Sequence, residues 1–535
     1  MYISPNSDVE FFKSAPFSPD HTHTVGFIGI QSQGAYFNTF QPKLMFGNQY
    51  YQRVTKDRIR IQHSADLLKE YNYMRFRNTA FSNKWFYAFV LEVEYINNTV
   101  CEVHYAIDVI QTYLFDITLL PCFVEREHSS TDAPGDNIVD EGIEVGEYVF
   151  NEYKSIINNP WMDVMVGAIE EGSTNYGAVY DGVYHGDYIT CFHIANTGGI
   201  DALNAYLASF RTTPENVTQL YTIPREFVPN DGSPAWYPGN STVAPARDYT
   251  LGSDGHIPNP EPSALEKNGL DGYIPKNNKL FTYPYNFLHI DNANGSELNL
   301  RYEFFSTPVA NVNLSCTITQ PVTVKLVPRF YKNSLYNESE TLSLSGYPVC
   351  SWSSDSYYAW VAQNSSIENN AFRFQGLANF AITAGQLATG VGATSAFVGT
   401  AVRGATSILN DVHNMIDNRT KASFATDVCR GTANSNINCA SGTQNFYYGR
   451  CSINAQNAQI IDSYFDRFGY AVKRIKQPVF NARPEWNYIK TKGCELTASI
   501  PGDAYREICD IFDNGITFWK NPLHVGNFSL DNRLV

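Results

Sequence analysis

The sequence lacks the short motifs that mark most enzymes and metal-binding domains. It contains no GxSxG, GxGxxG, GxxxxGK[ST] or HExxH pattern, so nothing in it supports catalysis or a bound cofactor. Ten cysteines are present but none forms a CxxC pair, whereas zinc sites usually place their ligands in close pairs. Disulfide scaffolds are short and far denser in cysteine. We therefore expect no catalytic site, no cofactor and no metal, in a chain made in a reducing cytoplasm.

Runs of lysine and arginine are also missing. The chain has 38 Lys and Arg against 53 Asp and Glu, a formal net charge of −15, whereas nucleic-acid readers normally carry a basic patch. An acidic surface repels DNA phosphates, which argues against DNA binding but not against letting DNA pass. The N-terminus, MYISPNSDVEFFKS, has neither a basic region nor an apolar core. We therefore expect no signal peptide and no export by the usual route.

Aromatic residues, in contrast, are abundant. The chain has 34 Phe and 35 Tyr, and only 17% of its residues are charged. Together with many Asn, Thr, Ser and Gly, this composition favours strands joined by turns over helical bundles. Single hydrophobic cores stop growing near about 250–300 residues, so a chain of 535 residues should hold several domains. The expected fold class is mainly β and multidomain.

Alternation of apolar and polar residues predicts two β-hairpins. The first hairpin turns at Asn97-Asn98, and the apolar residues that alternate after the turn are Cys101, Val103, Tyr105, Ile107 and Val109. The second hairpin turns at Asn294-Gly295. The strands around it are expected to resume at Leu280 and to continue to about Trp360.

Apolar residues at three- and four-residue spacing predict two short amphipathic helices, one within residues 198–217 and one at 455–468. Between the hairpins, residues 229–272 are crowded with Pro, Gly, Ser and Asn, which indicates a long linker or surface excursion and a domain boundary. After the helix at 455–468, the chain to Val535 reads as strand-like.

Two clusters of polar residues suggest metal or acid-base chemistry at first sight. Glu125, Glu127 and His128 lie in CFVEREHSS, but neighbouring residues on a strand point to opposite faces and would not converge. A charged strand end with an ion pair through Arg126 is the better interpretation. The His-x-His pair at residues 21–23 could chelate a metal from one strand face, an interpretation that we do not favour.

The most unusual feature is an uncharged stretch, Phe374–Val402, which is flanked by Arg373 and Arg403. As a single helix it would span ~43 Å, more than the ~30 Å hydrocarbon core of a bilayer. Its Gly, Thr, Gln and Asn make it too polar for an ordinary anchor, and its apolar spacing predicts two helical stretches around a glycine break at 390–392. A buried helical hairpin, an oligomer interface and a conditional membrane-insertion segment all remain open.

Several stretches, in order along most of the chain, resemble the tail-knob or distal tail tube proteins of small short-tailed phages of Gram-positive bacteria, the Salasmaviridae and Rountreeviridae type. The stretches are NKWFYAFVLEVEYINN (Asn83–Asn98), AIDVIQTYLFDI running into CFVEREH (Ala106–His128), DEGIEVGEYV (Asp140–Val149), GYIPKNNKLFTYPYNFL (Gly272–Leu288) and IPGDAYREICDIFDNGITFWKNP (Ile500–Pro522). Their shared order is more specific than any one of them.

The resemblance implies a homohexameric tube at the tip of a short tail, built from β-barrel tube domains with inserted domains. It also implies that a long hydrophobic loop plugs the tube before infection and then helps to form a conduit through the host cell membrane. The uncharged stretch sits in the corresponding place, which favours conditional membrane insertion. The residues expected to act on the membrane are Leu377, Phe380, Ile382, Leu387, Val391, Phe397, Val398, Val402, Ile408 and Leu409.

The resemblance and the composition together predict five regions. They are an N-terminal β tube region (1–148), an inserted domain (149–245), a second β region (246–365), the hydrophobic membrane-active loop (366–425), and a return segment with a C-terminal tube region (426–535). Implied partners are the other copies of the hexamer, other tail proteins (the lower collar or tail tube) and, after triggering, the host membrane. DNA would pass through the lumen of the virion's tail tip without specific binding.

Two other functions remain as alternatives. A receptor-binding or cell-wall-degrading tail component of the glycosidase type would need paired carboxylates about 5–10 Å apart, a spacing that only the fold can supply. A pore-forming toxin would normally need an export route. Hydrolysis of wall glycans would favour the first, and a ring-shaped oligomer with a channel would favour the tube.

Overall fold

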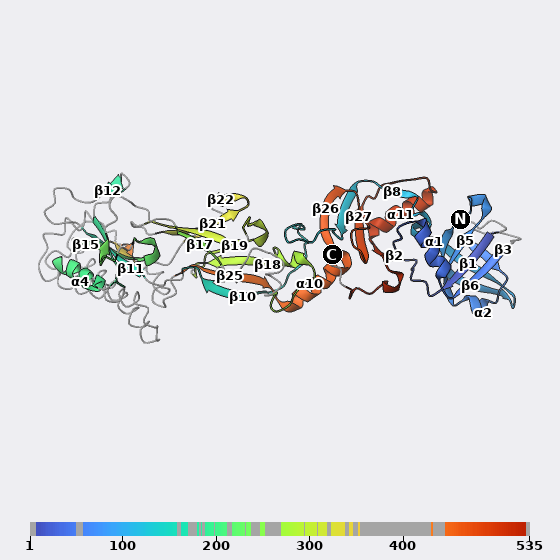
Figure 1. Ribbon diagram of the computed structural model, residues 1–535, viewed down its shortest axis with the longest axis horizontal. Helices are drawn as coiled ribbons and strands as arrows, with labels where there is room; N and C mark the ends of the chain where they lie inside the picture. Colours follow the sequence, from blue (N-terminus) through green and yellow to red (C-terminus); the bar gives the residue numbers. More distant parts are fainter. Residues whose placement is uncertain are drawn as a thin grey trace, which may run out of the picture. The chain divides into compact units, whose positions relative to one another are not determined.

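The computed structural model divides into two compact units that share one chain (Figure 1). Unit 1 comprises Met1–Gly146, Glu266–Phe281 and Asn454–Val535, and unit 2 comprises Glu147–Leu265 and Thr282–Ile453. The structure describes residues 7–49, 57–157, 162–168, 179–180, 183–184, 188–196, 198–210, 217–229, 232–236, 247–251, 269–293, 295–307, 309–317, 323–336, 342–345, 351–353, 430–431 and 445–530. The expected mainly β, multidomain fold is confirmed. The five expected regions stay a prediction.

The first sheet of unit 1 is antiparallel and has six strands, in the order β3-β1-β5-β6-β7-β4. Its strands are β1 (Ser7–Lys13), β3 (Lys43–Gln49), β4 (Arg58–Ile61), β5 (Tyr71–Arg77), β6 (Phe86–Asn97) and β7 (Val100–Ile107). The β6–β7 hairpin confirms the predicted turn at Asn97-Asn98, and Cys101, Val103 and Tyr105 are buried as expected.

The expected alternation stops earlier than predicted, because Val109 begins helix α3 (Val109–Tyr113). Asp108 caps this helix: its side chain accepts a hydrogen bond from the backbone N–H of Gln111. Such a cap satisfies one of the free amides of the first turn. It therefore ends the strand, although the apolar pattern continues through Val109.

A second sheet of unit 1 pairs a strand from the N-terminal part of the sequence with strands from its C-terminal part. Its order is β2-β29-β27-β9-β26, and β2 pairs with β29 in parallel while the other pairs are antiparallel. A small ladder of β8 and β28 adjoins it in sequence. The strands are β2 (His23–Val25), β8 (Ile117–Leu119), β9 (Cys122–Glu127), β26 (Tyr470–Lys476), β27 (Trp486–Lys492), β28 (Leu496–Ala498) and β29 (Ile516–Trp519).

Besides α3, the described part of unit 1 contains four α-helices: α1 (Ile30–Thr39), α2 (Ala65–Leu68), α10 (Ala455–Phe468) and α11 (Gly502–Asn514). Helix α10 confirms the helix predicted at 455–468. Helix α11 contradicts the expectation of strand-like residues to Val535. Its buried residues fall at helical spacing, so one face packs into the core while the other stays polar; they are Ala504, Ile508, Ile511 and Phe512.

The described part of unit 2 contains three larger sheets, all of which contribute buried residues to a shared hydrophobic core. The strands of the first are β10 (Tyr148–Ser155), β25 (Tyr447–Ile453), β18 (Asn286–Asp291) and β19 (Glu297–Leu300), in that order; those of the second are β16 (Ala235–Trp236), β14 (Tyr188–Phe192), β11 (Met162–Ala168), β15 (Val217–Pro224), β23 (Ser351–Ser353) and β24 (Arg430–Gly431); those of the third are β17 (Arg247–Thr250), β20 (Asn311–Cys316), β21 (Val324–Tyr331) and β22 (Ser334–Tyr336). A two-stranded ladder joins β12 (Val179–Tyr180) to β13 (Val183–Tyr184).

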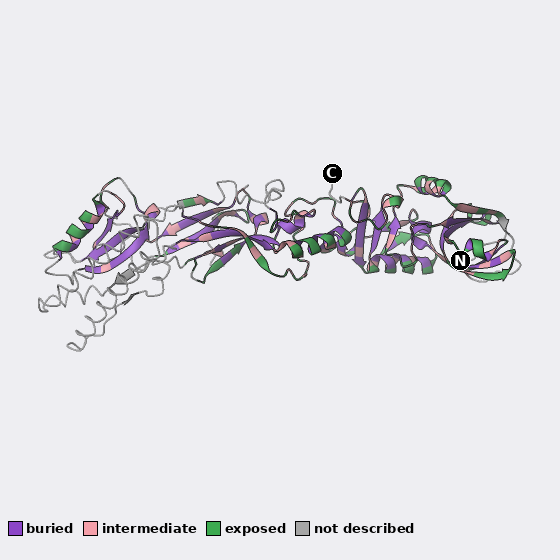
Figure 2. Cartoon of the chain, turned by 90° about the horizontal axis from the view of Figure 1, so that it is seen from below, coloured by how far each residue is buried: buried purple, intermediate pink, exposed green. Residues whose placement is uncertain are grey.

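Buried residues follow the strands of both units, and exposed residues line the outer faces of the helices (Figure 2). The predicted helix within 198–217 is confirmed as α4 (Gly199–Ser209), and the predicted hairpin at Asn294-Gly295 is confirmed as β18–β19. Strands do not resume at Leu280, however. That residue lies in a 3₁₀ helix, η4 (Asn278–Phe281), and the next strand begins at Asn286.

Candidate functional site

The residues expected to act on the membrane lie outside the described residues, so their role stays a prediction. These are Leu377, Phe380, Ile382, Leu387, Val391, Phe397, Val398, Val402, Ile408 and Leu409, all within 354–429. Among the helices that the structure does describe, none has both the length and the apolar character needed to cross a membrane.

A different site lies within unit 1, close in sequence to the residues at which the chain leaves and re-enters that unit. The chain crosses at residues 146–147, 265–266, 281–282 and 453–454, and unit 1 holds the adjoining segments together with buried polar side chains. We call this set the junction network. Its members come from three separate stretches of unit 1 and are Arg126, Asp132, Glu141, Asn277, Lys279, Asp462, Asp466 and Tyr470.

Asp462 on α10 is the centre of one half of the junction network. Its Oδ1 accepts hydrogen bonds from the backbone N–H and the side-chain amide of Asn277, at 3.0 and 2.8 Å. Its Oδ2 accepts from the Tyr273 hydroxyl at 2.7 Å and from the Lys276 backbone N–H at 2.8 Å. One buried carboxylate thus fixes a five-residue turn of the 269–281 segment. Charged acceptors of this kind make the stronger hydrogen bonds of proteins.

The neighbouring carboxylates extend this contact. Asp466, one helical turn after Asp462, accepts from the Asn277 amide at 2.9 Å. Asp132 accepts from the Tyr470 hydroxyl at 2.5 Å and from the Asn278 backbone N–H at 3.0 Å. Burial is the main cause that raises the pKa of Asp132 and Asp466. The 129–146, 269–281 and 454–470 segments are therefore tied to one another by side chains rather than by strand pairing.

Glu141 is the centre of the other half. Its carboxylate pairs with both Arg126 of β9 and Lys279 of η4, and it accepts a hydrogen bond from the Ala471 backbone N–H at 2.9 Å. Lys279 also donates to the Val139 carbonyl oxygen at 2.8 Å. Burial of the ammonium, with repulsion from Arg126, lowers the pKa of Lys279 to about 7. Cations from two segments thus meet on one carboxylate.

Glu127 and His128 have structural roles, as the sequence analysis favoured. Glu127 pairs with Lys476 of the adjacent strand β26. The Nδ1 of His128 accepts a hydrogen bond from the Tyr488 backbone N–H at 2.7 Å, and its Nε2 faces the Phe465 carbonyl oxygen at 3.3 Å. Nδ1 must be unprotonated to accept, so Nε2 carries the proton. Both ring nitrogens are occupied by backbone groups, and neither is available to a metal. The predicted ion pair of Arg126 is confirmed, with Glu141 as its partner.

Burial lowers the pKa of His128 well below its usual value, with Arg483 adding to the effect. In the unfolded chain this histidine binds a proton near pH 6.5, whereas in the folded chain it stays neutral at that pH. The stability that His128 contributes is therefore complete above pH 6.5 and is lost as the pH falls below it. We expect acidification from pH 7.5 to 5.5 to reduce the free energy of unfolding of unit 1 by about 1.4 kcal/mol through this group. Denaturant titrations at both pH values measure it.

The matched variant is His128→Asn, since the Asn oxygen retains an acceptor near the position of Nδ1. It should flatten the pH dependence. An undiminished pH dependence in His128→Asn would contradict the assignment.

The two histidines at 21–23 have separate partners. His21 Nε2 lies 3.7 Å from Asp108 Oδ1, and its ring contacts Phe89 edge-on. His23 faces the Thr22 hydroxyl with Nδ1 at 3.2 Å. These two histidines therefore make separate local contacts with neighbouring side chains.

The junction network was missed by the sequence analysis. The one signal for it was the placement of Asp462 and Asp466 at i and i+4, which puts two carboxylates on one face of the predicted helix. Nothing in the sequence marks their partner Asn277, which is far away in the chain. The polar groups of the network form hydrogen bonds and ion pairs with one another. Its role is therefore structural: it holds three segments of unit 1 together.

Two family models of phage tail proteins match the sequence of the chain. A family model described as the C-terminal domain of Bacillus phage phi29 tail knob protein gp9 matches residues 254–533, more than half of the chain. A second, described as the N-terminus of a caudoviral major tail protein, matches residues 5–118.

Curated relatives and a solved structure agree with these matches. The tail knob proteins gp9 of Bacillus phages PZA, phi29 and B103 are 25%, 24% and 26% identical to the chain, and each comparison covers 99% of this chain and 98% of the relative. The structure of the bacteriophage C1 tail knob protein gp12 shares the fold, with a TM-score of 0.64, 13% identity, and coverage of 97% of this chain and 98% of that one. The chain therefore belongs to the family of phage tail knob proteins typified by that of phage phi29.

Proposed function

We propose that the chain forms a homohexameric tube that closes the distal end of a short phage tail and then opens it, using residues 366–425 to breach the host cell membrane for genome ejection. The observation that carries this proposal is the match to tail knob proteins over 99% of the chain. The match extends over both units, so both belong to the tail component. The chain is made in the host cytoplasm and reaches its place in the virion by assembly with other tail proteins, the lower collar or tail tube.

Exposed apolar side chains support self-association. Strand β26 lies at an edge of its sheet, and Ile475 on it is 75% exposed. Ile28, before α1, is fully exposed, and Leu523 near the C-terminus is 90% exposed. A sheet edge with apolar side chains invites pairing with another chain, and repetition of one such contact around an axis closes a ring. A ring provides these groups with partners.

The uncharged stretch is suited to two environments. Six copies inside a tube can bury their apolar residues against one another, and in a bilayer helices satisfy their own backbone hydrogen bonds. Its five glycines between Phe374 and Val402 weaken helices by about 1 kcal/mol each relative to alanine, which favours rearrangement. The net charge of −15 gives passing DNA little to bind.

Deletion of residues 376–416 tests the membrane role. Full-length protein, triggered by acid, is expected to release dye from liposomes, and the deletion variant is expected to release none while still forming six-fold rings by electron microscopy. The reason is that the deleted residues contain the apolar groups proposed to enter the bilayer. Dye release and ring images of the same preparations measure both properties.

A charge substitution is the finer version of this test. Lysine at a helix centre costs about 2.5–3.5 kcal/mol in a bilayer, so Leu387→Lys with Val391→Lys should suppress leakage strongly. The control is Leu67→Lys, which adds a charge at a leucine that is 60% exposed and lies outside the proposed membrane-active residues, and it should leak like the unchanged protein. Equal leakage with and without residues 376–416, or no leakage by the full chain under any trigger, would overturn the membrane role. Failure to form rings would overturn the tube.

A further inference from the structure

Three chemically reactive side chains converge on one face of unit 2. Cys191 is on β14, His193 follows the end of that strand, and Asp163 is on the neighbouring strand β11. The antiparallel register pairs Val164 with Phe192, which brings Asp163 opposite His193. Residues 191 and 193 are two apart, so both point to the same face. The sheet therefore builds the cluster from two strands.

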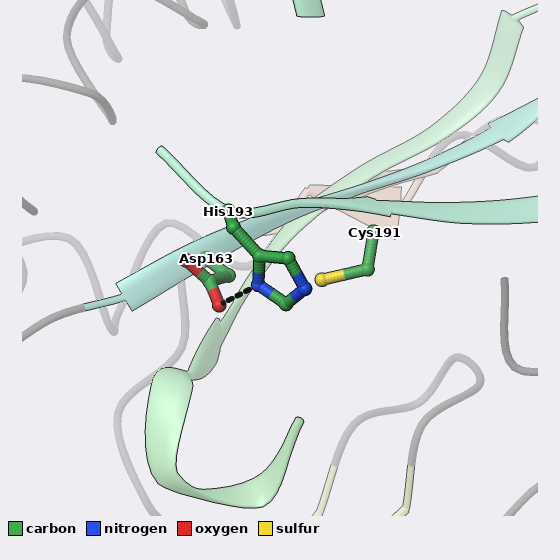
Figure 3. Close-up of side chains that lie close together, drawn as sticks. All are labelled: Asp163, Cys191 and His193. Carbon is green, nitrogen blue, oxygen red and sulfur yellow. Dashed lines mark hydrogen bonds and ion pairs between the residues drawn. The ribbon is translucent and has the colours of Figure 1, made fainter. Parts of the chain in front are cut away.

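The geometry of the cluster is ordered (Figure 3). Nδ1 of His193 lies 2.7 Å from Asp163 Oδ2, and the Cys191 sulfur points toward the opposite side of the ring. One potential ligand atom from each of the three residues lies within 4.8 Å of the others. The carboxylate selects the tautomer with the proton on Nδ1, so that Nε2 presents a lone pair on the side of the sulfur.

All three side chains are buried, and two of their polar atoms have no hydrogen-bond partner among the described residues. Asp163, Cys191 and His193 are 0% exposed, and the unpartnered atoms are Asp163 Oδ1 and His193 Nε2. A buried polar atom without a partner costs about 1–3 kcal/mol. Of the two atoms, Nε2 of His193 lies on the side of the Cys191 thiol, which points to an occupant that binds both nitrogen and sulfur.

We propose that Cys191 and His193 bind a zinc-type metal ion through Sγ and Nε2, with Asp163 as the hydrogen-bonded carboxylate that orients the imidazole. Thiolate and imidazole are the ligands that zinc prefers, and two ligands of a tetrahedral zinc ion lie about 3.5 Å apart. A spread within 4.8 Å closes to that distance with a small movement of side chains. A carboxylate on the second ring nitrogen is the usual support of a metal-bound histidine.

Charge balance also favours a divalent ion. One thiolate and one carboxylate neutralise the two positive charges, and a neutral cluster avoids the large cost of an uncompensated charge in a core. Without metal, burial and the nearby Asp163 raise the pKa of the Cys191 thiol well above its usual value. Binding therefore replaces the S–H bond by a metal–sulfur bond and releases one proton to solvent.

The same three residue types also form nucleophilic triads, in which a histidine oriented by a carboxylate activates a thiol. A nucleophile must meet its substrate, however, and no atom of this cluster reaches the surface of unit 2. A small ion can enter a buried site during local opening, whereas a peptide or glycan cannot.

The experiment uses the full chain, freed of metal and then titrated with Co²⁺ or Zn²⁺ alone. Cobalt is expected to give a thiolate-to-metal charge-transfer band, with one equivalent per chain, and excess zinc is expected to abolish it. Zinc should also raise the melting temperature of the full chain. Cys191→Ser and His193→Gln should lose the band, and Asp163→Asn should keep it with affinity weakened by about 10–100-fold.

The matched control is Cys316→Ser. Cys316 is a buried thiol in the same hydrophobic core as Cys191, so this variant carries the same loss of a thiol without touching the cluster and should bind metal normally. If Cys191→Ser does not fold, as judged by circular dichroism, the cobalt spectra of the unchanged chain and of Cys316→Ser still decide. No charge-transfer band in the folded chain, or an unchanged band in a folded Cys191→Ser variant, would overturn the proposal.

Discussion

Replacing Arg75 by methionine is expected to lower the free energy of unfolding of unit 1 by about 3–5 kcal/mol, because it leaves the carboxylate of Glu10 buried without its counter-charge. The Arg75 guanidinium lies 2.7 Å from Glu10 Oε2 through Nη2, and it also donates to the Asn38 side chain at 2.7 Å. Its side chain is 1% exposed and that of Glu10 is 6% exposed. The guanidinium also stacks over the Trp85 ring, 4.1 Å from its centroid.

The same strand offers a matched control. Arg77, two residues along β5, pairs with Asp8 of β1 and lies over the Trp85 ring too, but its side chain is 43% exposed. Pairs in water contribute about 0–1 kcal/mol, so Arg77→Met should cost far less than Arg75→Met. Hydrogen exchange of the slowest amides in β5 and β6 measures both, because those amides report opening of unit 1 itself.

The expected loss of stability comes from the unpaired charge of Glu10 more than from the lost packing of the arginine side chain. Adding Glu10→Gln to Arg75→Met removes the uncompensated carboxylate and should recover part of the lost stability. Equal losses for Arg75→Met and Arg77→Met, or no recovery in the double variant, would mean that the buried charge is not the source of the effect.

The second large effect is expected at Asp462. Asp462→Ala removes the acceptor of four hydrogen bonds and leaves the buried side chain of Asn277 and the Tyr273 hydroxyl with fewer partners. Hydrogen bonds to charged groups contribute about 1.5–3 kcal/mol each, though not additively. We expect a loss of about 3–5 kcal/mol in the stability of unit 1, and faster exchange or proteolysis of the 269–281 segment.

Asp510→Ala is the control for Asp462→Ala. Asp510 also lies on a helix of unit 1, α11, but faces solvent, and such substitutions usually stay within about 0.5 kcal/mol. If the 269–281 segment remained as protected in Asp462→Ala as in Asp510→Ala, the junction network would not hold that segment in place.

Local patterns predicted the elements that depend on neighbours in sequence. The β6–β7 hairpin needs only alternation around a turn, and α10 needs only one apolar face, so both were predicted correctly. Helix α11 was missed because its residues lie between strands and include aromatic and branched side chains that also suit strands. Ile508, Ile511 and Phe512 fall at helical spacing, and counting that spacing would have found the helix.

Contacts across long stretches of chain could not be predicted. No local pattern indicates that Asp462 accepts from Asn277, or that β2 lies beside β29 in parallel, since these depend on how the chain returns. The Cys191–His193 spacing was a usable signal, because alternate residues of a strand share a face, but Asp163 comes to it only through sheet pairing. The uncharged stretch stays a prediction, because it lies outside the described residues.

The parallel pairing of β2 with β29 means that this sheet can form only late in translation. Thr24 is opposite Phe518, so the ribosome makes one strand near the start of translation and its neighbour near the end, after all of unit 2. Domains generally fold as units while the chain emerges, but this sheet has no place for β2 until β29 and β27 exist. A premature stop before α11 would thus yield a chain in which β2 has no β29 to pair with, and only chains translated through β29 can complete this sheet.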